Sequence, residues 1–153
     1  LKCHFPGCLL MSNNDYAVYP EAQADELDKA KLILMMFAGS INFLNKAIEI
    51  AESDITEMNK LVSKTKNVLL ELMASLNLEE SGEMGEILLR AYRGLFLKLN
   101  VAHIENSVDK VVEVKDSLIE LEDAWKKVFR SPEYQAFKQT QGNVARKQQV
   151  IRR

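Results

Sequence analysis

Apolar residues recur at helical spacing through most of the chain. From about residue 25 they fall three or four positions apart, as they do on one face of an α-helix. Four such stripes follow one another, separated by short polar breaks. Their members are Leu34, Phe37, Ile41, Leu44 and Ile48; Leu61, Val68, Leu72 and Leu76; Met84, Leu88, Ala91, Leu95, Leu99 and Ala102; and Val111, Val114, Leu118, Leu121, Trp125 and Val128.

The polar breaks between the stripes predict short loops. Ser53 and Asp54 can stop the first helix and cap the second, with Glu57 as a capping-box partner. Residues 77–82 indicate a turn, and residues 105–107 offer a third break. Helices joined by short loops must turn back on one another. We therefore predict an all-α fold, an antiparallel up-down-up-down four-helix bundle.

Proline and glycine usage supports the helical prediction. The chain has three prolines, and none lies between Pro20 and Pro132. It also has only six glycines, which makes a turn-rich sheet protein a poor match. Ser131 followed by Pro132 has the chemistry of a new helix start. A short extra helix at this terminus is therefore expected, with Tyr134, Phe137, Val144 and Ile151 as its apolar residues.

Charge is distributed unevenly along the chain. The formal net charge is −2, yet every Asp and Glu lies at or before Glu133, and five basic residues follow it. This pattern argues against a body that binds nucleic acid. The longest apolar run, residues 32–38, is far shorter than the roughly 18–20 residues that cross a bilayer, so we predict no membrane insertion. No signal peptide is visible, and the body lacks cysteine, as suits the cytoplasm.

The sequence offers little for catalysis or for a cofactor. Cys3, His4 and Cys8 lack the spacing of a zinc module and are expected to belong to a disordered or non-native leader, with Met11 as a candidate natural start. His103 stands alone in the bundle region, without the E-x-x-H pairs of a di-metal bundle. Residues 81–85 lack the Lys-Ser/Thr of a phosphate loop. We predict no metal, no cofactor and no enzymatic activity.

The helices carry more apolar residues than a bundle core needs. A bundle helix usually requires an apolar face of about three positions in seven. The first and third helices exceed this share, so grooves or patches should emerge that fit amphipathic helices. A terminal segment or a second copy of the chain could equally cover them. The additional residues are Leu32, Ile33, Met35, Met36, Phe43, Ala47, Ile50, Ile87, Leu89, Phe96, Leu97 and Val101.

These blocks together resemble the FliS family of flagellar export chaperones. The resemblance runs from about Tyr16 to Lys126. It rests on the order and spacing of N-D-Y-A-V-Y, L-I-L-M-M-F-A-G-S-I-N-F-L-N-K-A, I-E-I-A-E-S-D-I-T-E-M-N, V-L-L-E-L-M-A-S-L-N, S-G-E, L-L-R-A-Y-R, N-V-A-H-I-E-N-S-V-D-K-V and the closing L-I-E-L-E-D-A-W-K. The chain departs from the family where a Pro or Ser-Pro commonly precedes the first helix, and where a Gly pair commonly stands at Ser81-Gly82.

The resemblance implies a function in binding rather than catalysis. It implies a cytoplasmic chaperone that binds the disordered C-terminal segment of flagellin in apolar grooves and prevents premature polymerisation before flagellar type III secretion. The alternative is a helical adaptor or regulator for another amphipathic helix of the export machinery, such as an export-gate protein. Self-association through the apolar groove also stays open.

We also predict a division of the chain and a set of client-binding residues. Residues 1–24 are expected to form a leader and a groove-covering segment, 25–130 the bundle, and 131–153 a basic tail that could be helical. Tyr16 and Tyr19 would cover part of the groove or simply pin a loop to the bundle, and Tyr92 and Trp125 are assigned to the core. The predicted client-binding residues are Tyr16, Tyr19, Leu32, Met36, Phe43, Ile55, Val62 and Leu69.

Overall fold

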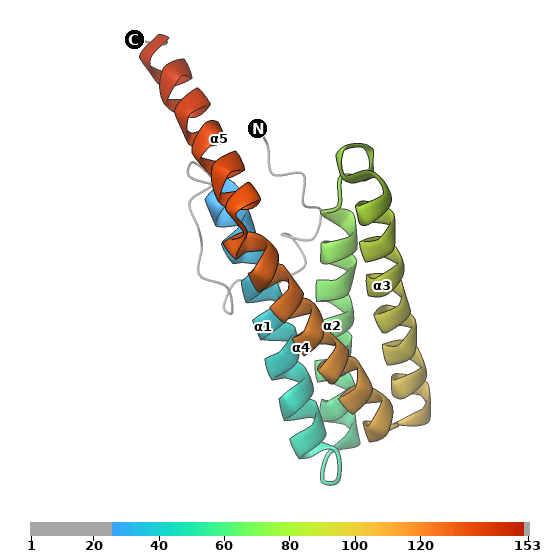
Figure 1. Ribbon diagram of the computed structural model, residues 1–153. Coiled ribbons are helices and arrows are strands. Elements are labelled where there is room, and N and C mark those ends of the chain that lie inside the picture. The colour runs from blue at the N-terminus through green and yellow to red at the C-terminus, as the bar shows by residue number, and fades with distance from the viewer. Residues whose placement is uncertain (1–25, 152–153) are drawn as a thin grey trace.

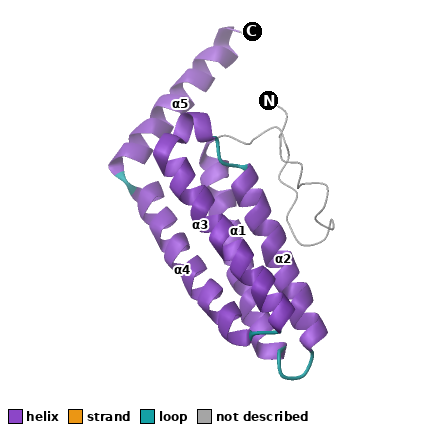
Figure 2. Cartoon of the chain, turned by 90° about the vertical axis from the view of Figure 1, so that its right-hand side faces the viewer, coloured by secondary structure: helices purple, strands orange, loops and turns teal. Residues whose placement is uncertain are grey.

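The structure is a computed structural model that describes residues 26–151, and every regular element in this part of the chain is an α-helix (Figures 1 and 2). The predicted all-α class is therefore confirmed. The additional terminal helix is also present, and it runs for 20 residues. The helices are α1 (Glu26–Ile50), α2 (Ile55–Ala74), α3 (Leu78–Glu105), α4 (Val108–Arg130) and α5 (Pro132–Ile151).

The first four helices form the predicted antiparallel bundle. Each packs against its neighbour in the chain, and α4 closes the ring by packing against α1 (Figure 1). The loops 51–54, 75–77 and 106–107 are too short for anything but a reversal of direction. Helix α5 makes few contacts, to α4 and α1. The bundle is thus complete with four helices, and α5 is an addition to it.

The core lies along the axis of the bundle, and all four helices contribute to it. Its side chains come mainly from the apolar stripes of the sequence, and most are fully buried. Removing this apolar surface from water supplies the main favourable free energy of folding. The core consists of Met36, Phe37, Leu44, Ala47, Ala51, Met58, Leu61, Val62, Val68, Leu69, Leu72, Tyr92, Leu99, Ala102, Val111, Val114 and Leu118.

Helix α1 is apolar beyond what the core uses. By length and composition alone, its segment Lys29–Ile50 could cross a membrane, although the core helix of a globular protein can meet the same criterion. Phe37, Leu44 and Ala47 are fully buried in the bundle, which explains one side of the helix. Only 28% of its most apolar window is buried. Much of the apolar surface of α1 therefore stays outside the core.

Local capping interactions fix the ends of the helices. Asp54 caps α2, because its Oδ1 accepts a hydrogen bond from the Glu57 backbone N–H at 2.9 Å. The expected reciprocal bond from the Asp54 N–H to Glu57 is replaced, because this N–H donates to the Ile50 carbonyl at 2.8 Å and the Glu57 carboxylate pairs with Lys60 at 3.3 Å. Ser107 caps α4, and Ser131 Oγ accepts from the Tyr134 N–H at the start of α5. The sequence placed these boundaries correctly.

The turn predicted at residues 77–82 has a more specific form. Asn77 caps α3, and a first helical turn follows directly. Gly82 then interrupts the helix with φ of +53° and ψ of −133°, a conformation that residues with a side chain rarely adopt. At the other end of α3, Asn106 takes the left-handed conformation with φ of 50°. The kink at Gly82 therefore lies inside α3, close to its start.

Two predicted core positions are wrong. Met84 is 61% exposed and Val128 is 49% exposed, although both continue the apolar stripes of their helices. An ion pair joins Lys98 of α3 to Glu113 of α4 at 2.8 Å and shows which residues of the two antiparallel helices lie side by side. In that register Met84 and Val128 lie at the same end of the bundle. Each is the terminal member of its stripe, where no neighbouring helix covers it.

Aromatic side chains connect the core to α5. Tyr92 is buried and its ring lies 6.2 Å from that of Phe37, and the Trp125 indole N–H donates to the Tyr92 hydroxyl at 2.9 Å. Trp125 stacks on Phe129 at 5.2 Å, and Phe129 contacts Tyr134 of α5 at 5.0 Å. The pKa of the Tyr92 phenol is raised, because the effect of burial exceeds the opposing effect of the hydrogen bond with Trp125. Tyr92 is thus a core residue, as expected, and the half-buried Trp125 packs against the core.

The Asp54 cap should contribute measurably to stability. Replacement Asp54→Ala is expected to lower the free energy of unfolding by about 1 kcal/mol, because the Glu57 N–H loses its acceptor. Asp116→Ala is the matched control, since Asp116 is an exposed residue inside α4 and alanine favours helix. Urea unfolding followed by circular dichroism measures both. Equal losses in the two variants would contradict the capping role.

The Tyr92 hydroxyl should make stability depend on alkaline pH. At pH 7, Tyr92→Phe is expected to cost about 1 kcal/mol, because the Trp125 N–H loses its partner. The pKa of Tyr92 is higher in the folded state than in the unfolded state. Its contribution to the stability of the wild type is therefore fully present below about pH 10, and it is lost as the pH rises through the folded-state pKa. The variant lacks this loss, so the difference between the two proteins should shrink at alkaline pH. Urea unfolding of both proteins across this pH range measures it, and a constant difference would contradict the prediction.

Candidate binding surface

The predicted client-binding residues that the structure describes do not share one surface. Tyr16 and Tyr19 lie outside the described residues. Leu32 and Ile55 are exposed, at 36% and 39%. Phe43 is half-buried on α1 and packs against the core.

Three of the eight residues are part of the bundle core. Met36 is 6% exposed, and Val62 and Leu69 are fully buried. Val62 and Leu69 are one heptad apart, so they point the same way from α2, and that way is inward. In this conformation the other helices already cover these three side chains. Contact between them and a client stays a prediction, and it would require the bundle to open.

A groove between α1 and α2 brings together residues that sequence reasoning largely missed. Its volume is about 830 Å³. Of the predicted residues within 26–151 only Phe43 lines it, next to Met35, Ile50 and Leu61. We call this surface the α1–α2 groove. The remaining lining residues are Ala38, Gly39, Asn42, Lys46, Glu49, Glu57 and Lys64.

The groove follows from a second stripe along α1. Met35, Gly39, Phe43 and Ile50 recur at spacings of four, four and seven residues, on a different side of the helix from the inward stripe. The small residues Ala38 and Gly39 lie between Met35 and Phe43 along the helix. The signal was present in the excess apolar residues of the first helix. Its periodicity could have separated Met35 and Ile50 from the core.

Charged side chains border the apolar surface of the groove. The Lys64 ammonium group lies 5.5 Å from the centre of the Phe43 ring, a cation–π contact. Lys46 and two carboxylates, Glu49 and Glu57, complete a border of both signs. Glu71 lies on the same side of α2 as Glu57 and Lys64, at heptad spacing, and burial raises the pKa of its carboxyl. The groove therefore offers apolar contact at its centre and charged groups at its edge.

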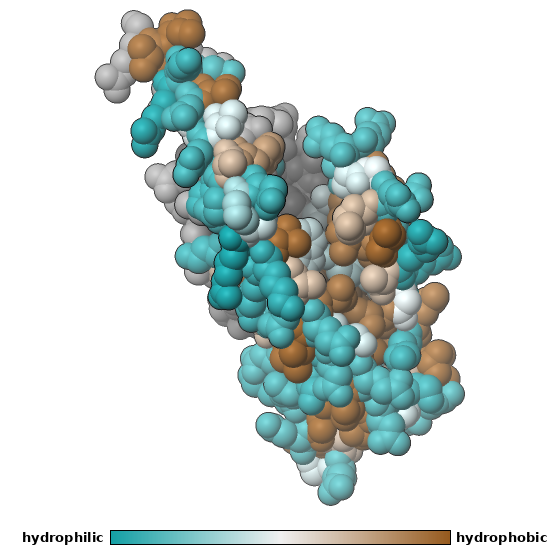
Figure 3. Space-filling view, in the orientation of Figure 1, coloured by the Kyte–Doolittle hydropathy of each residue, from teal (hydrophilic) through white to brown (hydrophobic). Residues whose placement is uncertain are grey.

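A second apolar surface lies between the first half of α3 and the last half of α4. Figure 3 shows apolar side chains gathered between these two helices. Met84, Ile87 and Val128 are exposed there. We call this set, with the half-buried Leu88 and Leu121, the α3–α4 surface. This surface is apolar because the stripes of α3 and α4 continue to Met84 and Val128, where no other helix of the bundle covers them.

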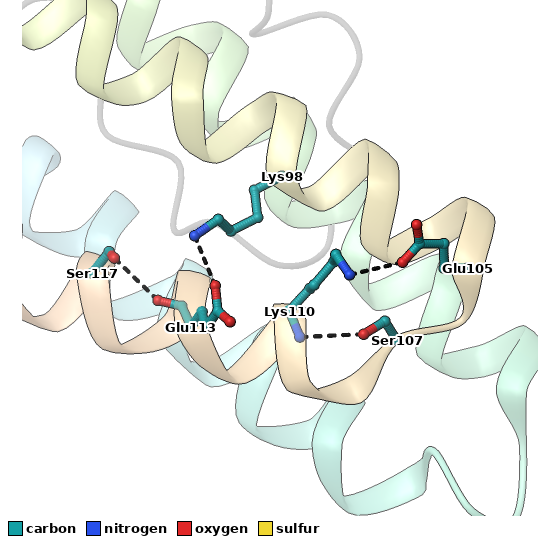
Figure 4. A network of polar contacts seen from close by, with 6 residues as sticks. All are labelled: Lys98, Glu105, Ser107, Lys110, Glu113 and Ser117. Carbon is teal, nitrogen blue, oxygen red and sulfur yellow. Dashed lines mark hydrogen bonds and ion pairs between the residues drawn. The ribbon is translucent and has the colours of Figure 1, made fainter.

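The polar clusters of the body hold helices together. Lys98 binds Glu113 across α3 and α4 at 2.8 Å, and Lys110 binds Glu105 across the loop at 2.8 Å (Figure 4). The Lys98 ammonium group lowers the pKa of the Glu113 carboxyl, and Glu105 raises the pKa of Lys110. Among residues 26–151 no group of three or more His, Cys, Asp or Glu side chains could hold a metal ion. His103 lies in the last turn of α3, where a histidine commonly interacts with the helix end.

Comparisons with known proteins agree on one family. The family model described as "Flagellar protein FliS" matches residues 11–132. The flagellar secretion chaperone FliS of Campylobacter jejuni is 30% identical over 123 residues, which cover 80% of this chain and 96% of that protein. Its namesake from Bacillus subtilis is 29% identical over 121 residues, covering 77% and 88%. That of Salmonella typhimurium is 27% identical over 107 residues, covering 69% and 79%.

Acidic substitutions should distinguish the buried predicted residues from the exposed ones. Leu69→Asp is expected to abolish cooperative unfolding, because it places a carboxylate where no solvent reaches. Leu32→Asp should change the free energy of unfolding by less than about 1 kcal/mol, since water still reaches this position. Thermal and urea unfolding of both variants measure this contrast. A cooperative transition in Leu69→Asp near that of the wild type would show that position 69 is not in the core.

Proposed function

The chain belongs to the FliS family of flagellar proteins, and from this premise we propose that it is a cytoplasmic export chaperone for flagellin. It binds the disordered C-terminal segment of flagellin and keeps that segment from driving polymerisation before flagellar type III secretion. The family is one of chaperones, and the chain acts by binding rather than by catalysis. Its proposed partner is therefore flagellin.

The α1–α2 groove is the observation that carries this proposal. An amphipathic helix binds a protein by laying apolar side chains into such a groove, at spacings of three, four and seven. Met35, Phe43 and Ile50 present apolar contact along α1, at spacings of eight and seven residues that place them on one side of the helix. Methionine adapts its shape easily to varied side chains, which suits a segment that folds as it binds. The groove thus matches a client that becomes helical on contact.

The size of the groove agrees with the cost of ordering a client. Ordering a disordered segment as it folds on binding costs about 2–5 kcal/mol of the free energy of interaction. At about 25 cal/mol per Å² of buried apolar area, roughly 200 Å² offsets the upper end of that range. A few large apolar side chains seated over Met35, Phe43 and Ile50 bury that much. The charged border formed by Lys46, Glu49, Glu57 and Lys64 then favours one orientation of the client.

A second partner is supported by the α3–α4 surface. It is formed by a different pair of helices from the α1–α2 groove, and Met84, Ile87 and Val128 are exposed on it. An adaptor function for another amphipathic helix of the export machinery, such as an export-gate protein, would use this surface. The two functions are compatible, because one helix pair serves each partner.

Matched methionine substitutions test the client site. We expect Met35→Glu, in the α1–α2 groove, to weaken binding of full-length flagellin by about tenfold or more, because a carboxylate replaces apolar contact. Met84→Glu, on the α3–α4 surface, should bind flagellin as the wild type does. Isothermal titration calorimetry gives the affinities, and size exclusion with light scattering shows complex formation. Circular dichroism verifies that both variants stay folded and detects helix gained by the client.

Flagellin lacking its C-terminal segment is the second control for this experiment. It should form no complex with the wild-type protein. Equal binding of the intact and truncated flagellins, or no binding of either one, would contradict the chaperone proposal. Loss of binding in Met84→Glu alone would move the client to the α3–α4 surface. A dimer of the chaperone by itself, abolished by Met35→Glu, would instead identify a second copy as the occupant of the groove.

A further inference from the structure

Helix α5 lies past the part of the chain that the family shares. The family match ends at residue 132, and α5 begins there. In Figures 1 and 2 its last turns extend beyond the end of the bundle. Only its start is held firmly, through the contact of Tyr134 with Phe129 at 5.0 Å and a hydrogen bond from the Gln135 side chain to the Phe129 carbonyl. The bundle therefore fixes the direction of α5 and leaves most of its length uncovered.

One side of α5 has the residue spacing of a coiled-coil helix. Positions 134, 137, 141, 144, 148 and 151 follow one another at alternating spacings of three and four. Phe137 and Val144 are each 48% exposed and Ile151 is 82% exposed, so the apolar members of this stripe face solvent. Glutamine occupies positions 141 and 148 of the sequence. Polar residues within such a seam set the register and the partner, at a cost in stability.

Basic residues flank this stripe on both sides. Lys138 follows Phe137 on one side, and Lys147 precedes position 148 on the other, in the places that contact the flanks of a partner helix. Arg146 lies on the back of the helix. Glu133 is the acidic residue of α5. From Phe137 onward, a partner helix would therefore meet positive charge at both edges of the stripe.

The charge and polarity of α5 discriminate between possible occupants. In a parallel pair of α5 helices Glu133 would face Lys138 of the second copy, but Lys147 would find no acidic counterpart there, because no Asp or Glu follows Glu133. A bilayer surface would have to accept glutamine positions within the apolar face, which weakens insertion. A helix with apolar seam residues and acidic flanks matches both the stripe and its edges. This complementarity selects a partner different from the chain itself.

We propose that α5 is a docking helix for an acidic amphipathic helix of another protein, which pairs with the stripe Phe137, Val144 and Ile151 as a short two-stranded coiled coil. Lys138 and Lys147 interact with acidic side chains that flank the partner's seam. Because Tyr134 packs on Phe129, and Phe129 on Trp125, the bundle presents this helix in a fixed direction. The site is separate from the α1–α2 groove, so a partner on α5 leaves the groove open.

A synthetic acidic peptide tests the proposal on the full-length protein. The probe is a three-heptad helix with leucine and asparagine in its seam and glutamate at its flanking positions, and a second probe carries lysine in place of glutamate. The acidic probe is expected to bind, and the basic probe to bind at least about tenfold more weakly. Isothermal titration calorimetry and light scattering measure affinity and stoichiometry. Binding of both probes alike would overturn the proposal.

Two pairs of matched variants locate the binding. Val144→Asp should weaken the acidic probe by about tenfold or more, whereas Val150→Asp, off the stripe and 76% exposed, should leave it unchanged. The double variant Lys138→Glu/Lys147→Glu should reverse the preference between the two probes, whereas Arg146→Glu should not. Equal effects within either pair would overturn the assignment. So would self-association that Val144→Asp abolishes, or binding to vesicles rich in anionic lipid without binding to the acidic probe.

Discussion

The structure depends on burying one side of α1. Phe37, Leu44 and Ala47 are fully buried where α1 meets α2 and α4, and this contact closes the ring of four helices. Helix α1 carries apolar side chains on more than one side, but only one side of a bundle helix can face the core. The stripe that packs inward stabilises the fold. The stripe of Met35, Phe43 and Ile50 is left at the surface, and the same packing that makes the core thus leaves the α1–α2 groove apolar.

A chain of aromatic contacts extends from this core to the end of the molecule. Phe37 contacts Tyr92, and Tyr92 is hydrogen-bonded to Trp125. Trp125 stacks on Phe129, which contacts Tyr134 of α5. Rings pack with defined geometry, so each contact restricts the orientation of the next. The direction of α5 is therefore coupled to the packing of the bundle, although α5 itself contributes little to the core. Ser131 and Pro132 supply the local break at which the chain changes direction.

Polar contacts between the helices agree with the register of the core and leave the apolar surfaces free. The pair of Lys98 and Glu113 joins α3 to α4, and Lys66 donates to Asn100 across α2 and α3 at 3.0 Å. Exposed ion pairs add little to stability, so the register is set mainly by the apolar core that all four helices share. With register set this way, Met84 and Val128 emerge together at one end of α3 and α4. Each apolar surface belongs to a different pair of helices, which allows a small bundle to contact more than one partner.

The sequence by itself determined the helices, their ends and their antiparallel order. These features are local: Asp54 and Ser107 cap the helix that follows each of them, and periodic apolar residues with short loops leave one simple topology. Tertiary structure decided which apolar face turned inward. Met36, Val62 and Leu69 went to the core, and Met35 and Ile50 went to the groove, because periodicity defines stripes but not the rotation of a helix in its bundle. That rotation is set by all neighbouring helices at once, and so the fold was predictable from the chain while most of the binding surface was not.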